Sequence, residues 1–206
     1  MRQAALDKAN DDPQGTAARI LDAAEAIFAE VGYAGTSTRE VARRARVPFG
    51  ALHYHWGSKK ELFEAVLARV AECLRDTLAR SLPSTAGSPG ETLDRLVDAF
   101  VDVLAQNRNG TRLLYRYTLE RYQPDPTELL LEFWGYLFQT LRDRGVTVPS
   151  DGAPMLVLAN AFVACVVDEL GQRVALEGDI RESPVARERL LVELRRLARS
   201  VFRVPA

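Results

Sequence analysis

The stretch VPFGALHYHWGSKKELF, residues 47–63, concentrates hydrogen-bonding side chains in a short span. It carries His53 and His55 with Tyr54 between them, and two adjacent lysines follow. Imidazole and phenol groups donate hydrogen bonds, and ammonium groups attract anions. General acid–base catalysis would need a carboxylate or thiol partner, and the two histidines have neither nearby in the sequence. These residue types therefore indicate binding rather than catalysis.

Metal and cofactor chemistry have little support elsewhere in the chain. The two histidines and two cysteines lack the short spacing of metal-ligand motifs. Cys73 and Cys165 have apolar neighbours, so we expect thiols buried in the core, with a redox or metal role as the alternative. Asp168-Glu169 stands alone after an apolar segment, and no phosphate-binding glycine loop is present. We predict no catalytic residue, no metal, no cofactor and no enzyme activity.

The net charge of −1 gives no global argument for a nucleic-acid partner, so local clustering must decide. From Thr16 to Leu62 the chain has seven basic and five acidic residues. Between Arg39 and Lys60 the only acidic residue is Glu40. This clustering marks the region as a candidate anion-binding surface.

Apolar residues recur with a helical period along almost the whole chain, and we find no convincing alternating strand pattern. A linker rich in Pro, Gly and Ser, Leu82–Gly90, separates two groups of helices. The chain is therefore predicted to be all-α. The expected helices span about 16–31, 38–45, 48–54, 59–82, 91–106, 111–122, 126–143, 153–177 and 184–202.

Helix boundaries around the row of histidines follow from local signals. Gly32 should end the first helix, and Gly57 the third. The sequences STRE (37–40) and SKKE (58–61) both fit a capping box, in which Ser and Glu satisfy backbone N–H groups reciprocally. Pro48 suits the first position of a helix because it has no N–H to lose there.

Two short helices, 38–45 and 48–54, are thus joined by a tight turn, with exposed arginines on the first. This arrangement predicts a helix-turn-helix, whose first helix crosses the phosphate backbone while the second lies in the major groove. The alternative is a small helical packing unit whose arginine face is only solvated.

The segment GYAGTSTREVARRARVPFGALHYHWGSKKELFEAVL, residues 32–67, resembles the DNA-binding region of TetR/AcrR-family transcriptional regulators. Those proteins carry T-[ST]-x-x-x-[IV]-A followed by G-x-L-Y-x-[HY]-F-x-[SN]-K-[ED]-x-L. The resemblance implies a nine-helix TetR-like fold with a flexible tail at 1–15. It also implies a helix-turn-helix DNA-binding domain at 16–62 and a helical ligand-binding and dimerisation domain at 63–206.

By this resemblance, His53 stands where the family usually has Tyr, and Trp56 where it usually has Phe. The row of histidines and Lys59 would grip phosphates, and the start of the third helix would read bases. Trp56, Leu52 and Phe63 are better explained as core anchors. The predicted DNA-binding residues are Thr38, Arg39, Arg46, Pro48, Phe49, Gly50, Ala51, His53, Tyr54, His55 and Lys59.

Two residues depart from the family pattern. Phe49 replaces a residue that is commonly polar or basic, so contact with thymine methyl groups or readout by arginines would have to replace hydrogen bonding. Arg46 replaces the usual glycine of the turn, and a non-glycine residue at positive φ would be mildly strained. Both departures bear on the operator sequence more than on DNA binding itself.

The last two helices are candidates for a subunit interface. Ala153–Glu177 carries a stripe of small residues, and Pro184–Phe202 carries leucines at helical spacing. Two copies of this pair could form a four-helix bundle; packing within one chain is the alternative. The family usually dimerises through these helices, which implies a homodimer on a palindromic double-stranded operator, with recognition helices roughly 34–36 Å or a multiple of that apart.

The middle helices are rich in aromatic residues, which either fill an ordinary core or line a ligand chamber. Arg112 and Arg116 could meet an anionic ligand, although a solvated or ion-paired face is the alternative. No apolar run reaches the roughly 18 residues of a membrane span, and the N-terminal residues are polar and acidic where a signal peptide would be apolar, so we expect a cytoplasmic protein without a membrane span. The resemblance implies a repressor that is released by a small apolar or aromatic effector. A DNA-binding or architectural protein without a ligand is the second reading. The predicted ligand-binding residues are Phe100, Tyr117, Phe133, Trp134 and Phe162.

Overall fold

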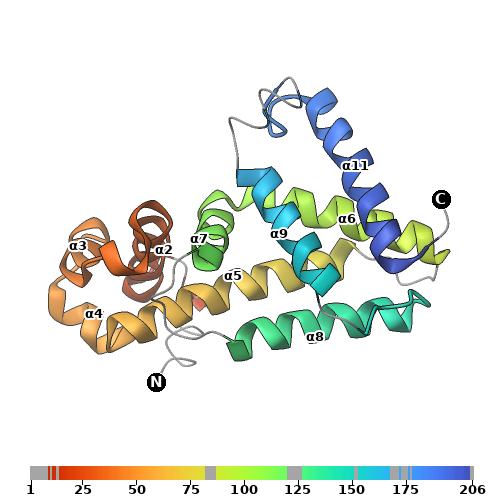
Figure 1. Ribbon diagram of the computed structural model, residues 1–206. Coiled ribbons are helices and arrows are strands. Elements are labelled where there is room, and N and C mark those ends of the chain that lie inside the picture. Colours follow the sequence, from red (N-terminus) through yellow and green to blue (C-terminus); the bar gives the residue numbers. More distant parts are fainter. Residues whose placement is uncertain are drawn as a thin grey trace. The chain divides into compact units, whose positions relative to one another are not determined.

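A computed structural model describes residues 9, 11–12, 14–81, 87–119, 127–150, 153–167, 172, 176 and 178–204 of the 206-residue chain. These residues form nine helices and no strand (Figure 1), which confirms the all-α prediction. The chain divides into two compact units. The N-terminal unit contains residues 1–72 and 112–130, and the C-terminal unit contains residues 73–111 and 131–206.

The N-terminal unit is built around an aromatic core. The rings of Phe28 and Phe63 meet edge to face with centroids 4.9 Å apart, and Tyr33 meets Phe63 at 5.0 Å. Phe28 and Phe63 are fully buried, and burial of each such side chain contributes about 1.5–3 kcal/mol. The helices around this core are α2 (Thr16–Gly35), α3 (Thr38–Arg44), α4 (Phe49–Trp56), the first part of α5 (Lys59–Ser81) and the last part of α7 (Arg108–Leu119).

The end of α2 is interrupted where the sequence predicts it. Gly32 has φ 75° and ψ 176°, a conformation that essentially only glycine adopts, and helical geometry then resumes as far as Gly35. The hydroxyl of Thr36 donates a buried hydrogen bond of 2.7 Å to the carbonyl oxygen of Gly32. This bond satisfies a carbonyl that the broken helix leaves without its usual partner.

The predicted capping box at the start of α3 is wrong. Ser37 is the N-cap residue, but its side chain accepts no capping hydrogen bond. Glu40 turns instead to Arg43, whose guanidinium donates to it at 2.7 and 2.6 Å. A charged partner one turn away outcompetes a neutral backbone N–H, because hydrogen bonds between charged groups are stronger.

The second predicted capping box is confirmed. The backbone N–H of Ser58 donates to Glu61 at 2.8 Å, and that of Glu61 donates to the Ser58 hydroxyl at 3.2 Å. A further capping box, which sequence reasoning missed inside the linker, opens α6 (Pro89–Gln106) with Ser88 and Glu91. The helix therefore begins two residues before its predicted start.

The C-terminal unit contains α6, the second part of α8 (Thr127–Asp143), α9 (Ala153–Val167) and α11 (Pro184–Phe202). Helix α11 packs against both α6 and α9. A ladder of Arg–Asp pairs ties α11 to α6, because aspartates four residues apart share one face of α6. The pairs are Arg199–Asp94 at 2.6 Å, Arg195–Asp98 at 2.8 Å and Arg187–Asp102 at 2.6 Å.

Two expectations for this unit are corrected. The helix that begins at Ala153 was expected to continue to Glu177, but Leu176 lies in a bend; α9 is described as far as Val167, and residues 168–171 lie outside the described residues. The buried Gln172 amide donates to the carbonyl oxygens of Cys165 and Val166 at 2.5 and 2.9 Å, so a side chain caps the helix end. Cys73 is exposed rather than buried, because it lies on the outer face of α5.

None of the helices in the described ranges is long and apolar enough to cross a membrane.

Candidate nucleic-acid interface

The interface is positioned by the apolar faces of two short helices. Val41 of α3 and both Leu52 and Trp56 of α4 are buried in the core of the N-terminal unit, with exposed fractions of 0%, 0% and 3%. The expectation that Leu52 and Trp56 anchor the core is therefore confirmed. Because these residues point inward, the opposite faces of both helices point to solvent. The indole N–H of Trp56 is buried and has no hydrogen-bond partner among the described residues, a cost that phenylalanine would not incur.

The predicted DNA-binding residues lie along this outer surface. Tyr54 is the most exposed large hydrophobic residue of those described, at 79%, and Phe49 is 41% exposed. Thr38, Ala51, His55 and Lys59 are half-buried. The exposed positions are Arg39, Arg46, Pro48, Phe49, Gly50, His53 and Tyr54.

Three of these residues form a stacked cluster across α3 and α4. The guanidinium carbon of Arg39 lies 5.8 Å from the centroid of the Phe49 ring, within range of a cation–π interaction. The Phe49 ring meets the His53 ring edge to face, with centroids 4.7 Å apart. Phe49 therefore holds a cation on one side and an imidazole on the other, an arrangement that the residue types alone did not indicate.

The arginines of α3 and the following turn differ in how much charge they present. Arg43 pairs with Glu40 at 2.6 Å, and Arg44 pairs with Glu30 of α2 at 2.8 Å. The hydrogen bonds of these pairs raise the pKa of both arginines and lower the pKa of both glutamates. Within the described part of the chain, Arg39 has no ion-pair partner. The net positive charge on α3 therefore resides mainly at Arg39.

The turn between α3 and α4 has the backbone that its sequence predicted. Arg46 has φ 56°, in the left-handed region that normally favours glycine. The N–H of Arg46 donates to the carbonyl of Arg43 at 3.1 Å, and that of Val47 donates to Ala42 at 3.0 Å. These bonds close the end of α3 in the same way as a C-terminal glycine cap. Pro48 is the N-cap of α4 rather than its first helical residue, and α4 continues to Trp56.

The side chain of Lys59 is less available for phosphate binding than the sequence suggested. Its ammonium nitrogen donates to the carbonyl oxygen of Ala34 at 3.3 Å and lies 4.6 Å from the centroid of the Tyr33 ring. Burial lowers the pKa of this amine below its ordinary value. Lys59 thus ties the start of α5 to the segment after α2, with donors remaining for an anion.

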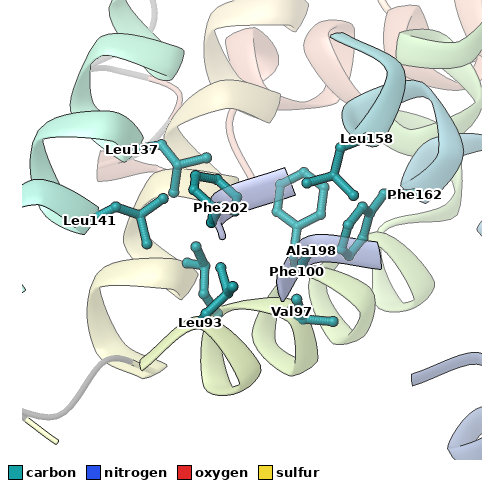
Figure 2. A pocket seen from close by; sticks show the side chains of 10 residues that line it. Leu93, Val97, Phe100, Leu137, Leu141, Leu158, Phe162, Ala198 and Phe202 are labelled. Atoms are coloured by element: carbon teal, nitrogen blue, oxygen red, sulfur yellow. The ribbon is translucent and has the colours of Figure 1, made fainter. Parts of the chain in front are cut away.

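The predicted ligand-binding residues map only partly onto a cavity. The C-terminal unit contains a partly open cavity of about 40 Å³ that is lined by apolar residues (Figure 2). Phe100 and Phe162 line it and meet edge to face at 5.3 Å. The side chains of Tyr117, Phe133 and Trp134 lie outside the described residues.

Most of the cavity lining was missed because it is aliphatic. Sequence reasoning selected aromatic residues, although apolar positions repeating at helical spacing in α6, α8 and α11 would have found the rest. Arg116, considered for an anionic ligand, donates to the backbone carbonyl of Glu30 at 2.8 Å within the N-terminal unit. The additional lining residues are Leu93, Leu96, Val97, Leu137, Leu141, Leu158, Ala198 and Phe202.

Comparison with known proteins agrees with this arrangement. Residues 20–66, which span the helices just described, match the model of a family described as "Bacterial regulatory proteins, tetR family". The HTH-type transcriptional repressor SCO4008 of Streptomyces coelicolor is 38% identical over 176 residues, covering 82% of this chain and 88% of that protein. The HTH-type transcriptional repressor Rv3405c of Mycobacterium tuberculosis is 38% identical over 117 residues, or 55% of this chain. The chain spans only 56% of the length of that second relative.

Solved structures show the same fold at low sequence identity. The transcriptional regulator FadR of Bacillus subtilis, solved with stearoyl-CoA, has a TM-score of 0.60 at 14% identity, covering 89% of this chain and 97% of that chain. The TetR-family regulator HI0893 of Haemophilus influenzae has a TM-score of 0.64 at 17% identity, covering 87% and 93%. The proteins matched are regulators, which confirms the prediction that this chain is not an enzyme. The chain belongs to the TetR family of bacterial regulatory proteins.

Proposed function

We propose that the protein is a transcriptional repressor that binds a palindromic operator as a homodimer and is released by a small apolar effector. The observation that carries the DNA-binding part is the outer surface of α3 and α4. On that surface Arg39, His53 and Tyr54 are exposed over a packed three-helix core, while the neighbouring arginines are neutralised by glutamates. Such a surface offers directional donors and positive charge to a nucleic acid.

The role of repressor is supported by the relatives, two of which are named repressors. Dimer formation is supported by α11, where Val185 and Val192 lie one heptad apart and are 64% and 51% exposed. Two large aliphatic side chains on one exposed helical face are better buried against a second copy. Part of the first predicted interface helix, residues 168–171, 173–175 and 177, lies outside the described residues.

DNA binding is tested by selecting fragments from a genomic pool that includes the DNA beside the protein's own gene. Anisotropy over a salt series then measures affinity for the selected sequence. We expect a palindrome bound by two chains, with a steep loss of affinity as salt rises, because phosphate contacts release counterions. Weak binding that is equal for all sequences would contradict a repressor and favour an architectural protein.

Arg39→Ala is expected to weaken operator binding by roughly tenfold or more, because one good arginine contact is worth about 1–3 kcal/mol. The double variant Glu40→Gln/Arg43→Gln is the matched control on the same helix, since it removes a balanced ion pair and leaves the net charge unchanged. We expect the control to change affinity less than threefold. Equal losses for both variants, measured in the same anisotropy assay, would contradict a charged contact between Arg39 and DNA.

The effector is proposed to occupy the cavity of the C-terminal unit. A volume of about 40 Å³ holds only a few atoms, so a larger ligand must move a helix. The Arg–Asp ladder holds α6 against α11, which leaves α8 and α9 as the more movable walls. Helices α5 and α7 each continue from one unit into the other and provide the covalent route for the signal. A 10–100-fold loss of operator affinity requires about 1.4–2.8 kcal/mol of differential binding.

Ala198→Val adds two carbon atoms to the cavity wall and is expected to abolish effector binding without changing operator affinity. Alkylbenzenes and medium-chain alcohols are suitable probes, since the wall has no polar group. In the unmodified protein they should raise Tm and weaken operator binding at least tenfold. Leu197→Val, at a partly exposed neighbouring position, is the control. If the probes leave operator affinity unchanged in the unmodified protein, the reading as a DNA-binding protein without a ligand is preferred.

A further inference from the structure

The side chain of His53 is held in one orientation by the end of its own helix. Its Nδ1 lies 2.6 Å from the carbonyl oxygen of Gly57. The N–H of Gly57 donates in turn to the carbonyl of His53 at 3.0 Å, so side chain and backbone close the same turn. The Phe49 ring supports the imidazole from the other side at 4.7 Å. The residue is exposed, and the ring nitrogen left for a partner is Nε2.

This geometry decides which nitrogen carries the proton. A carbonyl oxygen can only accept a hydrogen bond, so Nδ1 must be protonated. In the neutral ring Nε2 then has a lone pair and no hydrogen. Neutral His53 would therefore meet a phosphate oxygen with an acceptor facing an acceptor, which is repulsive. The imidazolium ion keeps the bond to Gly57 and gains an Nε2–H that can donate.

We infer that His53 contacts the operator backbone as an imidazolium ion, so that DNA binding takes up one proton at this residue in each protomer. The inference rests on the proposed DNA-binding function and deepens it. By linkage, the complex binds more protons than its separated components, so operator affinity rises as pH falls and is lost as pH rises. A histidine is suited to this role because its charge ordinarily changes between pH 5 and 8.

The neighbouring carboxylates do not supply this pH dependence. Glu30, Glu40 and Glu61 each accept hydrogen bonds that lower their pKa, from Arg44, Arg43 and Ser58 respectively, so they stay ionised from pH 6 to 8. The charged or titratable groups on the elements around α4 within the N-terminal unit are Arg19, Asp22, Glu25, Glu30 and Tyr33 on α2, Arg39, Glu40, Arg43 and Arg44 on α3, Arg46 in the turn, Tyr54 and His55 on α4, and Lys59, Lys60, Glu61, Glu64, Arg69 and Glu72 on α5.

Two of those groups require controls. His55 is the other histidine of the chain, and burial lowers the pKa of Lys59. His55→Gln removes the first source, and Lys59→Arg keeps a permanent charge at the second. His53→Tyr gives position 53 a phenol, which donates a hydrogen bond throughout this range.

The affinity of each protein for the selected operator is measured from pH 6 to pH 8 at constant ionic strength. We expect the unmodified protein, His55→Gln and Lys59→Arg to bind roughly tenfold more weakly at pH 8 than at pH 6 for each half-site. His53→Tyr should change less than twofold. A flat profile in the unmodified protein, or an unchanged slope in His53→Tyr, would overturn the inference. The inference would also be overturned if changing one base pair of the operator removed the contribution of His53 to affinity. Neutral Nε2 would then be accepting a hydrogen bond from a base amino group.

A second readout does not depend on DNA. The chain has two histidines, so ¹⁵N spectra of the labelled free protein resolve both rings, and His55→Gln assigns them. At pH 8 the Nδ1 of His53 should carry the proton. A predominant Nε2–H tautomer would overturn the inference even if the operator is bound. Absence of DNA binding at every pH would instead contradict the proposed function and the proton-linked contact that rests on it, whatever the tautomer.

Discussion

Replacing Phe63 with alanine is expected to lower the free energy of unfolding of the N-terminal unit by about 3–5 kcal/mol. Phe63 is fully buried and contacts the rings of both Phe28 and Tyr33. The substitution removes apolar area and both aromatic contacts, and it leaves a cavity that three surrounding helices cannot fill without losing their own packing. A loss of this size would consume much of the stability of a small domain.

The measurement is urea unfolding followed by the fluorescence of Trp56, which is buried in the same unit. Trp134→Phe serves as the background, so that only one tryptophan reports. Phe49→Ala is the matched control, because the same atoms are removed from a side chain that is 41% exposed. It should cost less than about 1 kcal/mol. Similar losses in both variants would mean that the aromatic cluster does not hold the unit together.

Phe49→Ala also separates an effect on stability from an effect on DNA binding. Phe49→Ala removes the ring between Arg39 and His53 while leaving the core intact. Its operator affinity, measured beside that of Phe63→Ala at a temperature where both are folded, shows whether the cluster acts at the DNA surface.

Replacing Gly57 with alanine is expected to destabilise the same unit by about 2–4 kcal/mol. Gly57 has φ 66° and ψ −100°, and forcing another residue into such a conformation costs about 1–3 kcal/mol. The added Cβ would also lie 2.4 Å from Oε2 of Glu61. The carboxylate must move, which breaks its bond to the N–H of Ser58 and weakens the cap of α5 by about 0.5–2 kcal/mol.

Gly50→Ala, in the helix that Gly57 ends, is expected to change the free energy of unfolding in the opposite direction. No atom lies within 4 Å of a Cβ built on Gly50, and its φ is that of an ordinary residue. Alanine is preferred over glycine in a helix by about 0.5–1 kcal/mol, so this variant should be stabilised. Urea unfolding of Gly57→Ala and Gly50→Ala therefore shows whether the two substitutions change the free energy of unfolding in opposite directions. A mild effect at Gly57 would mean that the α4–α5 turn can relax, and that His53 is less firmly held than its bond to Gly57 indicates.

Much of the fold was predictable because it depends on neighbours along the chain. The helical period placed the elements, and the boundaries of α3 and α11 were predicted to within one residue. Local chemistry also predicted the break at Gly32, although α2 resumes as far as Gly35, and the capping box at Ser58, while the family resemblance pointed to the positive φ of Arg46. Two local predictions failed. Glu40 bonds to Arg43, which is a stronger partner than the backbone N–H, and α6 begins at a capping box inside an apparent linker.

The candidate site was predictable in membership but not in electrostatics. The sequence placed Arg39, Arg43 and Arg44 alike on one exposed helix, since residue type alone does not distinguish them. Tertiary structure separates them, because Glu30 lies 14 residues from Arg44 and becomes its neighbour only when α2 packs against α3. Likewise, Lys59 meets the carbonyl of Ala34, 25 residues away.

The sequence by itself determined the helices, the faces they bury and the family to which the protein belongs, because these follow from side chains at fixed spacing on one element. Tertiary structure decided which charges remain unpaired, how α6 joins α11 through pairs 85 to 105 residues apart, and the size of the apolar cavity. Those properties depend on the angle and register at which helices cross. That geometry is set by the packing of many side chains at once, and no local pattern encodes it.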